Sequence, residues 1–365
     1  MYYTEITKII EAGMRKDPMK VAGYSRLLAK KLSGDGEERV SNRILSALDK
    51  MGNGHAVMDA LTAMPVDQES RLDIADIDYA PDVDSLILSE SMQDMLNDFR
   101  DTIQNKSKMM SLGLEFRNTL LLYGPPGCGK TSAAKYLASE IELPLVTARF
   151  DTLISSLLGN TAKNIHRIFD FAKKQPCVLF LDEFDAIAKA RDDAHELGEL
   201  KRVVNSLLQN IDDFSQDGIL IAATNHAQML DEAVWRRFQT VIELPKPGND
   251  EIRRYITQFP KVADASGINE PQWRTITESM SALSYSDIKD IVQNVLKKVV
   301  LKEKKEIECA DYLVEVFLFK NHGNYNQEEV VKFLYKSGVA QKQIARYYSI
   351  SERKVRNFLG KGVNK

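Results

Sequence analysis

The sequence predicts a doubly wound α/β domain in the middle of the chain, with helical regions before and after it. One observation is a glycine-rich segment, residues 124–131, that separates an apolar stretch from a run of helix-forming residues. The other is an alternation of short apolar stretches with longer helical patterns between Leu143 and Leu244, which is typical of βα units. The predicted strands are residues 120–123, 145–148, 178–181, 219–223 and 241–244.

The glycine-rich segment fits the pattern G-x-x-x-x-G-K-[ST] of a phosphate-binding loop. Its glycines let successive backbone N–H groups turn inward around a polyphosphate, and the dipole of the following helix favours the same anion. Lys130 would reach the outer phosphates, and the Thr131 hydroxyl would ligate Mg²⁺. A glycine–proline turn with a chance lysine is the alternative, and it does not explain the order of strand, loop and helix. The predicted nucleotide-binding residues are Gly124, Pro125, Pro126, Gly127, Cys128, Gly129, Lys130, Thr131 and Ser132.

The length of 365 residues and the hydrophobic content of 44% allow two or three domains with cores of their own. The N-terminal part carries no catalytic signature, and we expect it to be either a packing module or a docking site for a partner. The expected parts are a helical N-domain over 1–65, an acidic linker over 66–88, a large α/β subdomain over 89–248, a helical lid over 249–322 and a basic three-helix module over 323–365.

The charge and the cysteine content indicate which classes of protein the sequence fits. The net charge of −3 argues against a protein that coats nucleic acid, although residues 323–365 carry nine Lys or Arg against three Glu. The three cysteines show no metal-ligand spacing, and one lies in the phosphate loop, which favours a reducing compartment. With no signal peptide and no apolar run of 18 residues, we expect a cytoplasmic protein that does not enter a membrane.

Polar residues at the ends of predicted strands carry the expected chemistry. Asp182 and Glu183 follow an apolar strand, where carboxylates face the ligand crevice of a parallel sheet. Asp182 is placed to hold Mg²⁺, and Glu183 to orient and activate an attacking water. Asn225 ends the next predicted strand and would orient the same water or contact the γ-phosphate. Arg236 and Arg237 are either solvated surface or fingers that neutralise transition-state charge.

These residues together resemble the AAA+ ATPases, over about residues 85–300. Residues 124–131 look like Walker A, Asp182 and Glu183 like Walker B, and Asn225 like sensor 1. Arg236 and Arg237 look like the paired arginine fingers that act on a neighbouring subunit's nucleotide. The resemblance implies ATP and Mg²⁺ as cofactors, ATP hydrolysis to ADP and phosphate, and a ring-shaped homo-oligomer, with six subunits expected.

Two further segments place the chain within that family. Residues 283–288 are similar to the lid motif Gly-(aromatic)-Ser-Gly-Ala-Asp, although the first glycine is absent and Tyr285 stands where a glycine is common. This segment has no arginine, which is the pattern of the protein-remodelling (AAA) branch. Residues 155–160 match the pore loop of that branch, with Leu157 in place of the aromatic residue. Leu157 and Leu158 would either contact polypeptide in a pore or pack in the domain core, and residues 191–196 form a second candidate pore loop.

The basic tail predicts a helix-turn-helix. Three short helices are expected over 327–336, 341–348 and 352–359, with Ser351 as the N-cap of the third. Ser349 occupies the turn position where glycine is usual, and Ile350 and Val355 would fill the angle between the last two helices. Exposed basic residues on the third helix suit DNA phosphates and base edges. The same positive face also suits an acidic protein partner.

The layout of the whole chain is similar to bacterial AAA ATPases encoded beside a subtilisin-like serine protease and associated with anti-phage defence. The sequence therefore predicts an ATPase that remodels or regulates a partner protein, with such a protease as a candidate partner. The alternative is a DNA-binding regulatory protein, controlled by ATP, that acts through residues 323–365.

Overall fold

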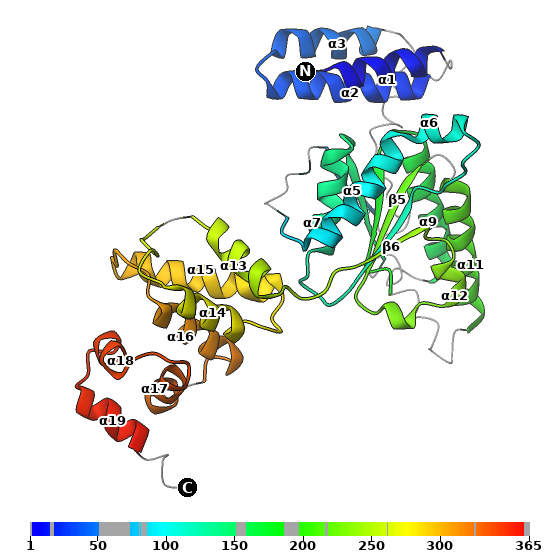
Figure 1. Ribbon diagram of the computed structural model, residues 1–365. Coiled ribbons are helices and arrows are strands. Elements are labelled where there is room, and N and C mark those ends of the chain that lie inside the picture. The colour runs from blue at the N-terminus through cyan, green and yellow to red at the C-terminus, as the bar shows by residue number, and fades with distance from the viewer. Residues whose placement is uncertain are drawn as a thin grey trace. The chain divides into compact units, whose positions relative to one another are not determined.

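The computed structural model describes residues 2–14, 18–50, 74–79, 81, 86–150, 158–185, 197–215, 218–260, 262–324 and 326–360. The chain forms two compact units (Figure 1). The first unit contains residues 1–86, 90–124 and 130–244, and the second contains residues 87–89, 125–129 and 245–365. The phosphate loop therefore begins and ends in the first unit, while its middle residues pack with the second.

A six-stranded sheet organises the first unit, with the strand order β1-β3-β4-β5-β2-β6. All neighbouring pairs are parallel except β1 with β3. The strands are β1 (Asp76–Asp78), β2 (Thr119–Tyr123), β3 (Leu145–Arg149), β4 (Val178–Asp182), β5 (Ile219–Thr224) and β6 (Thr240–Glu243). The five strands predicted from the sequence are confirmed to within one residue at either end. This sheet and the helices over it are the predicted doubly wound α/β core.

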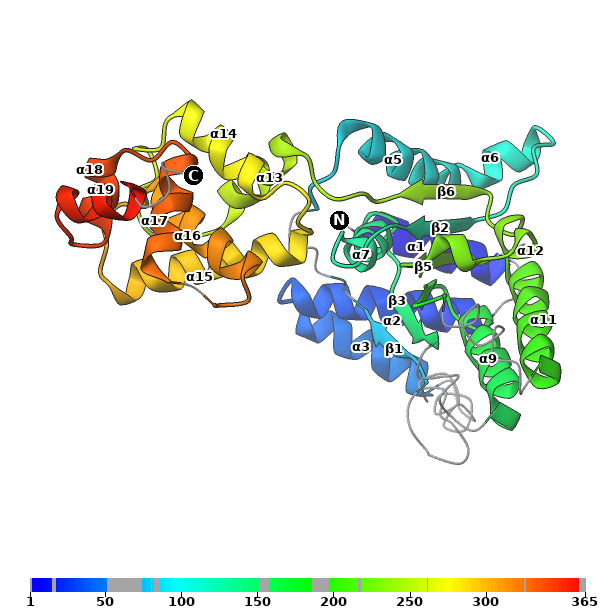
Figure 2. The same cartoon turned by 90° about the horizontal axis from the view of Figure 1, so that it is seen from below.

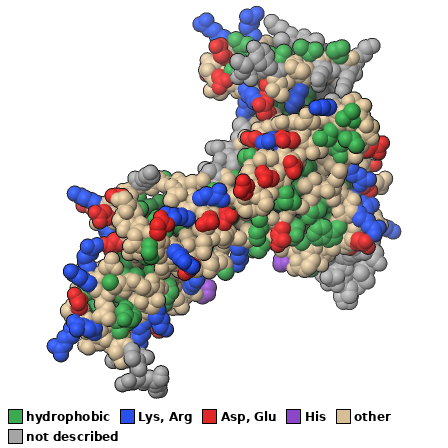
Figure 3. Space-filling model, viewed as in Figure 1, with side chains coloured by type: hydrophobic (Ala, Val, Ile, Leu, Met, Phe, Trp, Pro, Cys, Tyr) green, Lys and Arg blue, Asp and Glu red, His purple; other side chains and the backbone are tan. Residues whose placement is uncertain are grey.

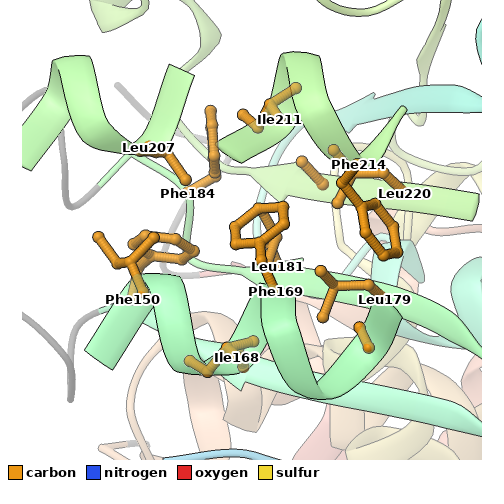
Figure 4. Packing of buried hydrophobic residues seen from close by; sticks show 14 of the residues in the cluster. Phe150, Ile168, Phe169, Leu179, Leu181, Phe184, Leu207, Ile211, Phe214 and Leu220 are labelled. Carbon is orange, nitrogen blue, oxygen red and sulfur yellow. The ribbon is translucent and has the colours of Figure 1, made fainter. Parts of the chain in front are cut away.

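Helices cover both faces of the sheet (Figures 1 and 2). On one face lie α5 (Glu90–Gln104) and α7 (Lys130–Glu140), and on the other lie α9 (Leu158–Lys173) and α11 (Leu197–Phe214). Figure 4 shows apolar side chains of β4 and β5 packed against those of α9 and α11. The rings of Phe150, Phe184 and Phe238 meet edge to face at 5.6 and 5.8 Å, a geometry that favours aromatic pairing. This core holds the strand ends that carry the candidate site.

The predicted N-terminal helices are present as α1 (Tyr3–Met14), α2 (Pro18–Gly34) and α3 (Glu38–Lys50). The helix α2 ends at Gly34, and Gly36 has a left-handed φ of 83° in the turn before α3. Within the stretch expected to be an acidic linker, Asp76–Asp78 forms the antiparallel edge strand β1. Ala75 is buried and Ile77 packs on the core, so apolar neighbours hold this acidic strand against β3.

The second unit is a helical lid continuous with the C-terminal helices. Its helices are α13 (Asn249–Gln258), α14 (Glu270–Ser279), α15 (Tyr285–Leu301), α16 (Cys309–Lys320), α17 (Gln327–Lys336), α18 (Gln341–Tyr347) and α19 (Glu352–Gly360). One hydrophobic cluster includes both lid residues, such as Ile291 and Leu313, and tail residues, such as Leu334 and Val355. The rings of Phe317 on α16 and Phe333 on α17 pack against each other in a tilted arrangement, with centroids 5.2 Å apart. The tail is thus built into the lid core.

Polar contacts join the tail to the lid as well. Arg346 on α18 pairs with Glu308 at the start of α16. The Lys304 ammonium lies 4.7 Å from the centre of the Tyr347 ring and 2.7 Å from the Asp311 carboxylate. No helix among the described residues is long and apolar enough to span a bilayer.

Candidate active site

The phosphate loop leaves β2 through a turn that only glycine fits. Gly124 has a φ of +141°, and a Cβ at this position would lie 2.2 Å from the carbonyl oxygen of Leu244. Real Cβ atoms do not approach backbone oxygens so closely, so any side chain here would displace the strand end. The loop ends at Lys130, the first residue of α7, whose buried ammonium donates to the Gly124 carbonyl at 2.8 Å. The loop therefore closes on itself around a cation.

The middle of the phosphate loop meets the predicted lid motif within the second unit. The Ser286 N–H donates to the Gly127 carbonyl at 3.2 Å, and a Cβ on Gly127 would lie 2.6 Å from Ser284 Oγ. Ser284 caps α15 in a reciprocal capping box with Asp287. Tyr285, which replaces a common glycine of the motif, packs edge to face on Tyr255 at 5.1 Å, and burial raises the pKa of its hydroxyl. The lid motif and the loop thus hold each other in place.

Asp182 joins the phosphate loop to the end of β4. One carboxylate oxygen accepts from the Thr131 hydroxyl at 3.2 Å, and the other accepts from the Glu183 N–H at 2.9 Å. Glu183 is exposed and has a left-handed φ of 54°, an uncommon backbone for a non-glycine residue and one found at functional turns. The two predicted metal ligands are therefore neighbours, and Glu183 follows at the strand tip.

The donor set fits Mg²⁺ that is held jointly with a nucleotide. Thr131 and Asp182 supply oxygen ligands, which Mg²⁺ prefers, and it commonly takes one or two protein ligands beside substrate phosphates and waters. No group of three or more His, Cys, Asp or Glu side chains suited to a metal occurs in the described parts of the chain. A metal here would depend on the phosphates for the rest of its shell.

Asn225 lies where the sequence analysis expects it, at the carboxyl end of β5. Because β5 pairs with β4 on one side and β2 on the other, its end lies between the Asp182 turn and the phosphate loop. Asp185 holds this position: it is 3% exposed and accepts from Thr224 Oγ1 at 3.1 Å and from the Asn225 N–H at 3.3 Å. Sequence reasoning missed this role of Asp185, since the pairing of β4 with β5 creates it.

Arg236 and Arg237 follow the short helix α12 (Glu232–Trp235), which Asp231 caps by accepting from the Val234 N–H at 2.8 Å. Their surroundings differ, since the Arg236 side chain is 71% exposed and the Arg237 side chain is 26% exposed. The first candidate pore residues, 155–157, and the second candidate pore loop, 191–196, lie outside the described residues. Leu158 begins α9.

The fold and the site define a P-loop nucleoside triphosphatase: a parallel sheet, a glycine-rich loop between β2 and α7, and an acidic pair at the tip of β4. Residues 120–246 match the model of the ATPase family associated with various cellular activities (AAA). Residues 120–246 are therefore similar to the ATPase core of this AAA family. The match covers the strands and loops that carry every predicted catalytic residue.

Similar proteins come from bacteria and archaea. An AAA family ATPase of Sinorhizobium fredii is 43% identical over 201 residues, which cover 55% of this chain and 59% of that protein. Proteasome-activating nucleotidase 1 of Halobacterium salinarum is 29% identical over 323 residues, with 82% of this chain and 78% of that protein covered. The corresponding nucleotidase 1 of Haloferax volcanii is 30% identical over 253 residues, with 67% and 62% covered. The chain thus spans about three fifths of the Sinorhizobium protein.

Proposed function

We propose that this protein hydrolyses ATP in a ring-shaped homo-oligomer, a hexamer by family resemblance, and uses the energy to remodel a partner protein. The observation that carries the proposal is Asp182, whose carboxylate contacts both the Thr131 hydroxyl of the phosphate loop and the Glu183 backbone. This contact puts the proposed phosphate site, metal site and water-activating carboxylate next to one another, although Thr131 and Asp182 are 51 residues apart in the sequence.

Each residue then has a defined task. Lys130 and the loop N–H groups bind the outer phosphates, and Thr131 with Asp182 holds Mg²⁺, which neutralises phosphate charge when bound. Glu183 orients the attacking water and accepts its proton. Asn225, held by Asp185 at the neighbouring strand end, fixes the direction of that water. The pair Arg236 and Arg237 serves the proposed site of an adjacent copy.

The relatives support a protein partner. Several of them are named proteasome-activating nucleotidases, so an ATPase that serves a protease fits this chain. A subtilisin-like serine protease, in a role in anti-phage defence, stays our candidate partner on the chain layout alone. Copies trapped with ATP would retain the partner and allow its identification by mass spectrometry.

The variant Glu183→Gln tests the catalytic assignment. It should bind Mg·ATP with nearly unchanged affinity while phosphate release falls by at least about 10²-fold, the range for loss of a positioned acid–base group. Glu303→Gln is a matched control, because Glu303 is also an exposed glutamate with a left-handed φ, 52° against 54°, but lies in the lid. Phosphate release by Glu183→Gln at the parent rate would disprove the assigned role.

Mixing subunits tests the ring. The double variant Arg236→Ala/Arg237→Ala has an intact phosphate loop, and Lys130→Ala has intact arginines. Each alone should be inactive, and mixtures should regain part of the parent activity because one copy supplies arginines to the nucleotide of the other. Mixtures that stay inactive, while both variants assemble normally on a sizing column, would contradict catalysis between copies.

A second candidate function, DNA binding, is favoured by the geometry of the tail. Ser349 has a left-handed φ of 52° in the turn between α18 and α19, and Ser351 caps α19 by accepting from the Lys354 N–H at 3.3 Å. Val355 is fully buried at the angle, while Arg353 and Arg356 are exposed. Figure 3 shows Lys and Arg side chains over this end of the second unit. We propose that α19 enters a DNA groove.

The test uses the full chain, because the tail shares the lid core. Binding of a fluorescent DNA duplex should weaken steeply with salt, and Arg353→Ala/Arg356→Ala should reduce the log–log salt slope by about 2 if both arginines contact phosphates. Lys289→Ala/Lys297→Ala removes the same charge from exposed positions of α15 and is the matched control. Equal losses in both double variants would favour nonspecific attraction, and no binding at low salt would exclude the function.

A further inference from the structure

Adjacent arginines 236 and 237 occupy different environments. The Arg236 side chain is 71% exposed, and its ion partner is Glu232, one turn earlier and 79% exposed. The Arg237 side chain is 26% exposed. An exposed pair four residues apart on one helix is weak, so Arg236 can leave Glu232 at little cost. Arg237, in contrast, is held by several hydrogen bonds.

Arg237 is fixed at both its side chain and its backbone. One guanidinium nitrogen donates to the Ala233 carbonyl at 2.6 Å and the other to Asp212 at 3.2 Å. Its carbonyl accepts from the Thr119 hydroxyl at 2.8 Å, at the start of β2. Its Nε is buried and has no hydrogen-bond partner among the described residues. This part of the side chain is therefore packed inside the protein. Arg237 thereby ties α12 to α11 and to the central sheet.

Asp212, near the end of α11, organises this contact. Its two carboxylate oxygens face two arginines, Arg237 at 3.2 Å and Arg117 at 3.5 Å. Arg117 is itself held next to β2, because its backbone N–H donates to the side chain of Gln239 at 2.5 Å. Asp212 therefore joins the segments that precede β2 and β6 to one helix end. Because both of its oxygens face arginines, Asp212 is suited to hold these segments in place and not to take part in the reaction.

Arg236 instead lines an open groove of about 990 Å³. Apolar side chains with little to cover them line or border the same groove, with Met110 61% exposed and Leu114 55% exposed. Figure 3 shows hydrophobic side chains over α6 (Lys106–Ser111) and the loop that follows. A largely exposed guanidinium beside an apolar rim suits contact with a second copy, in which the rim is covered and Arg236 exchanges Glu232 for another anion.

We infer that Arg236 alone reaches the nucleotide of a neighbouring copy, and that Arg237 is a positioning residue that Asp212 anchors. The inference rests on the proposed ring ATPase and separates two residues that the sequence pattern cannot distinguish. Arg236 supplies positive charge to the phosphate oxygens in the transition state. Arg237 and Asp212 hold the end of α12 so that Arg236 points out of its own chain.

The test compares conservative variants at both positions in the full chain. Arg236→Ala should lower kcat by about 10³-fold, the lower range for an arginine finger, with an unchanged melting temperature, and Arg236→Lys should recover little of the loss. Arg237→Met and Asp212→Asn should each lower the melting temperature as well as kcat. Arg237→Lys keeps the charge opposite Asp212, so it should recover most of what Arg237→Met loses. The double variant Arg237→Met/Asp212→Asn should be no less stable than the worse single variant.

Two results would overturn the inference. One is a loss of kcat in Arg237→Lys as large as in Arg236→Lys at a parent-like melting temperature, which would make Arg237 a finger. The other is additive destabilisation by Arg237→Met and Asp212→Asn, which would separate the two residues. If the ring proposal itself is wrong, the result is different: mixtures of Lys130→Ala with Arg236→Ala/Arg237→Ala never regain activity.

Discussion

Replacement of Asp185 by alanine should destabilise the sheet-containing unit by about 3 kcal/mol. The Asp185 side chain is 3% exposed, and one of its oxygens accepts from both the Thr224 hydroxyl and the Asn225 N–H. A hydrogen bond to a charged group contributes about 1.5–3 kcal/mol. The lower value applies here, because the distances of 3.1 and 3.3 Å are long for charged acceptors. Two such bonds give the expected loss.

The two tryptophans make this loss measurable in one unit at a time. Trp235 lies in the first unit and Trp273 in the second, so a Trp273→Phe background leaves a reporter of the sheet alone. With a slope of about 3 kcal/mol/M in urea, the fluorescence midpoint of Asp185→Ala should fall by about 1 M. Asp185→Asn keeps an acceptor oxygen and should lose about half as much. A midpoint for Asp185→Ala within about 0.2 M of the parent would refute the reasoning.

Three further predictions concern other parts of the chain. Gly124→Ala should abolish nucleotide binding in a fluorescent-nucleotide titration, whereas Gly113→Ala, at a φ of +76° with no atom within 4 Å of the added Cβ, should cost only about 1 kcal/mol and keep binding. Burial raises the pKa of Cys177 to about 12, so mass spectrometry should find it unmodified by iodoacetamide at pH 8.5 until urea unfolds the chain. The free energy of unfolding should also fall as the pH rises above about 9, the pKa of this thiol in the unfolded chain. Leu334→Ala should lower the unfolding free energy of the lid by about 3 kcal/mol, read by Trp273 in a Trp235→Phe background.

The sequence predicted the central fold closely because the inner strands β2, β4 and β5 are apolar along most of their length. A strand buried on both faces, such as Val178–Asp182, is marked by its own side chains. The strand Asp76–Asp78 is not, since two of its three residues are acidic and only its pairing with Leu145–Arg149 defines it. Edge strands of this kind depend on tertiary contacts that no local pattern records.

The candidate site divides in the same way. Residues that belong to a contiguous motif, such as Lys130 and Thr131, could be assigned from spacing, because the chemistry requires them at a fixed offset. The roles of Asp185 and Asp212 could not be assigned, because each acts on a residue 25 or more positions away through a helix or strand contact. The three tail helices were predicted as well, yet their apolar residues suit either a self-contained trihelix or a surface that packs on the lid.

The shared core of lid and tail limits how this chain can be cut and recombined. A fusion or truncation made at residue 323 would expose Phe317 and other lid side chains that α17 covers. It would also leave Leu334 and Val330 without their lid contacts on the separated C-terminal fragment. An exchange of C-terminal helices between two ATPases should succeed only when their lids match in shape where α16 meets α17. We therefore expect the C-terminal helices and the lid to evolve together as one unit, and not to be exchanged separately among ATPases.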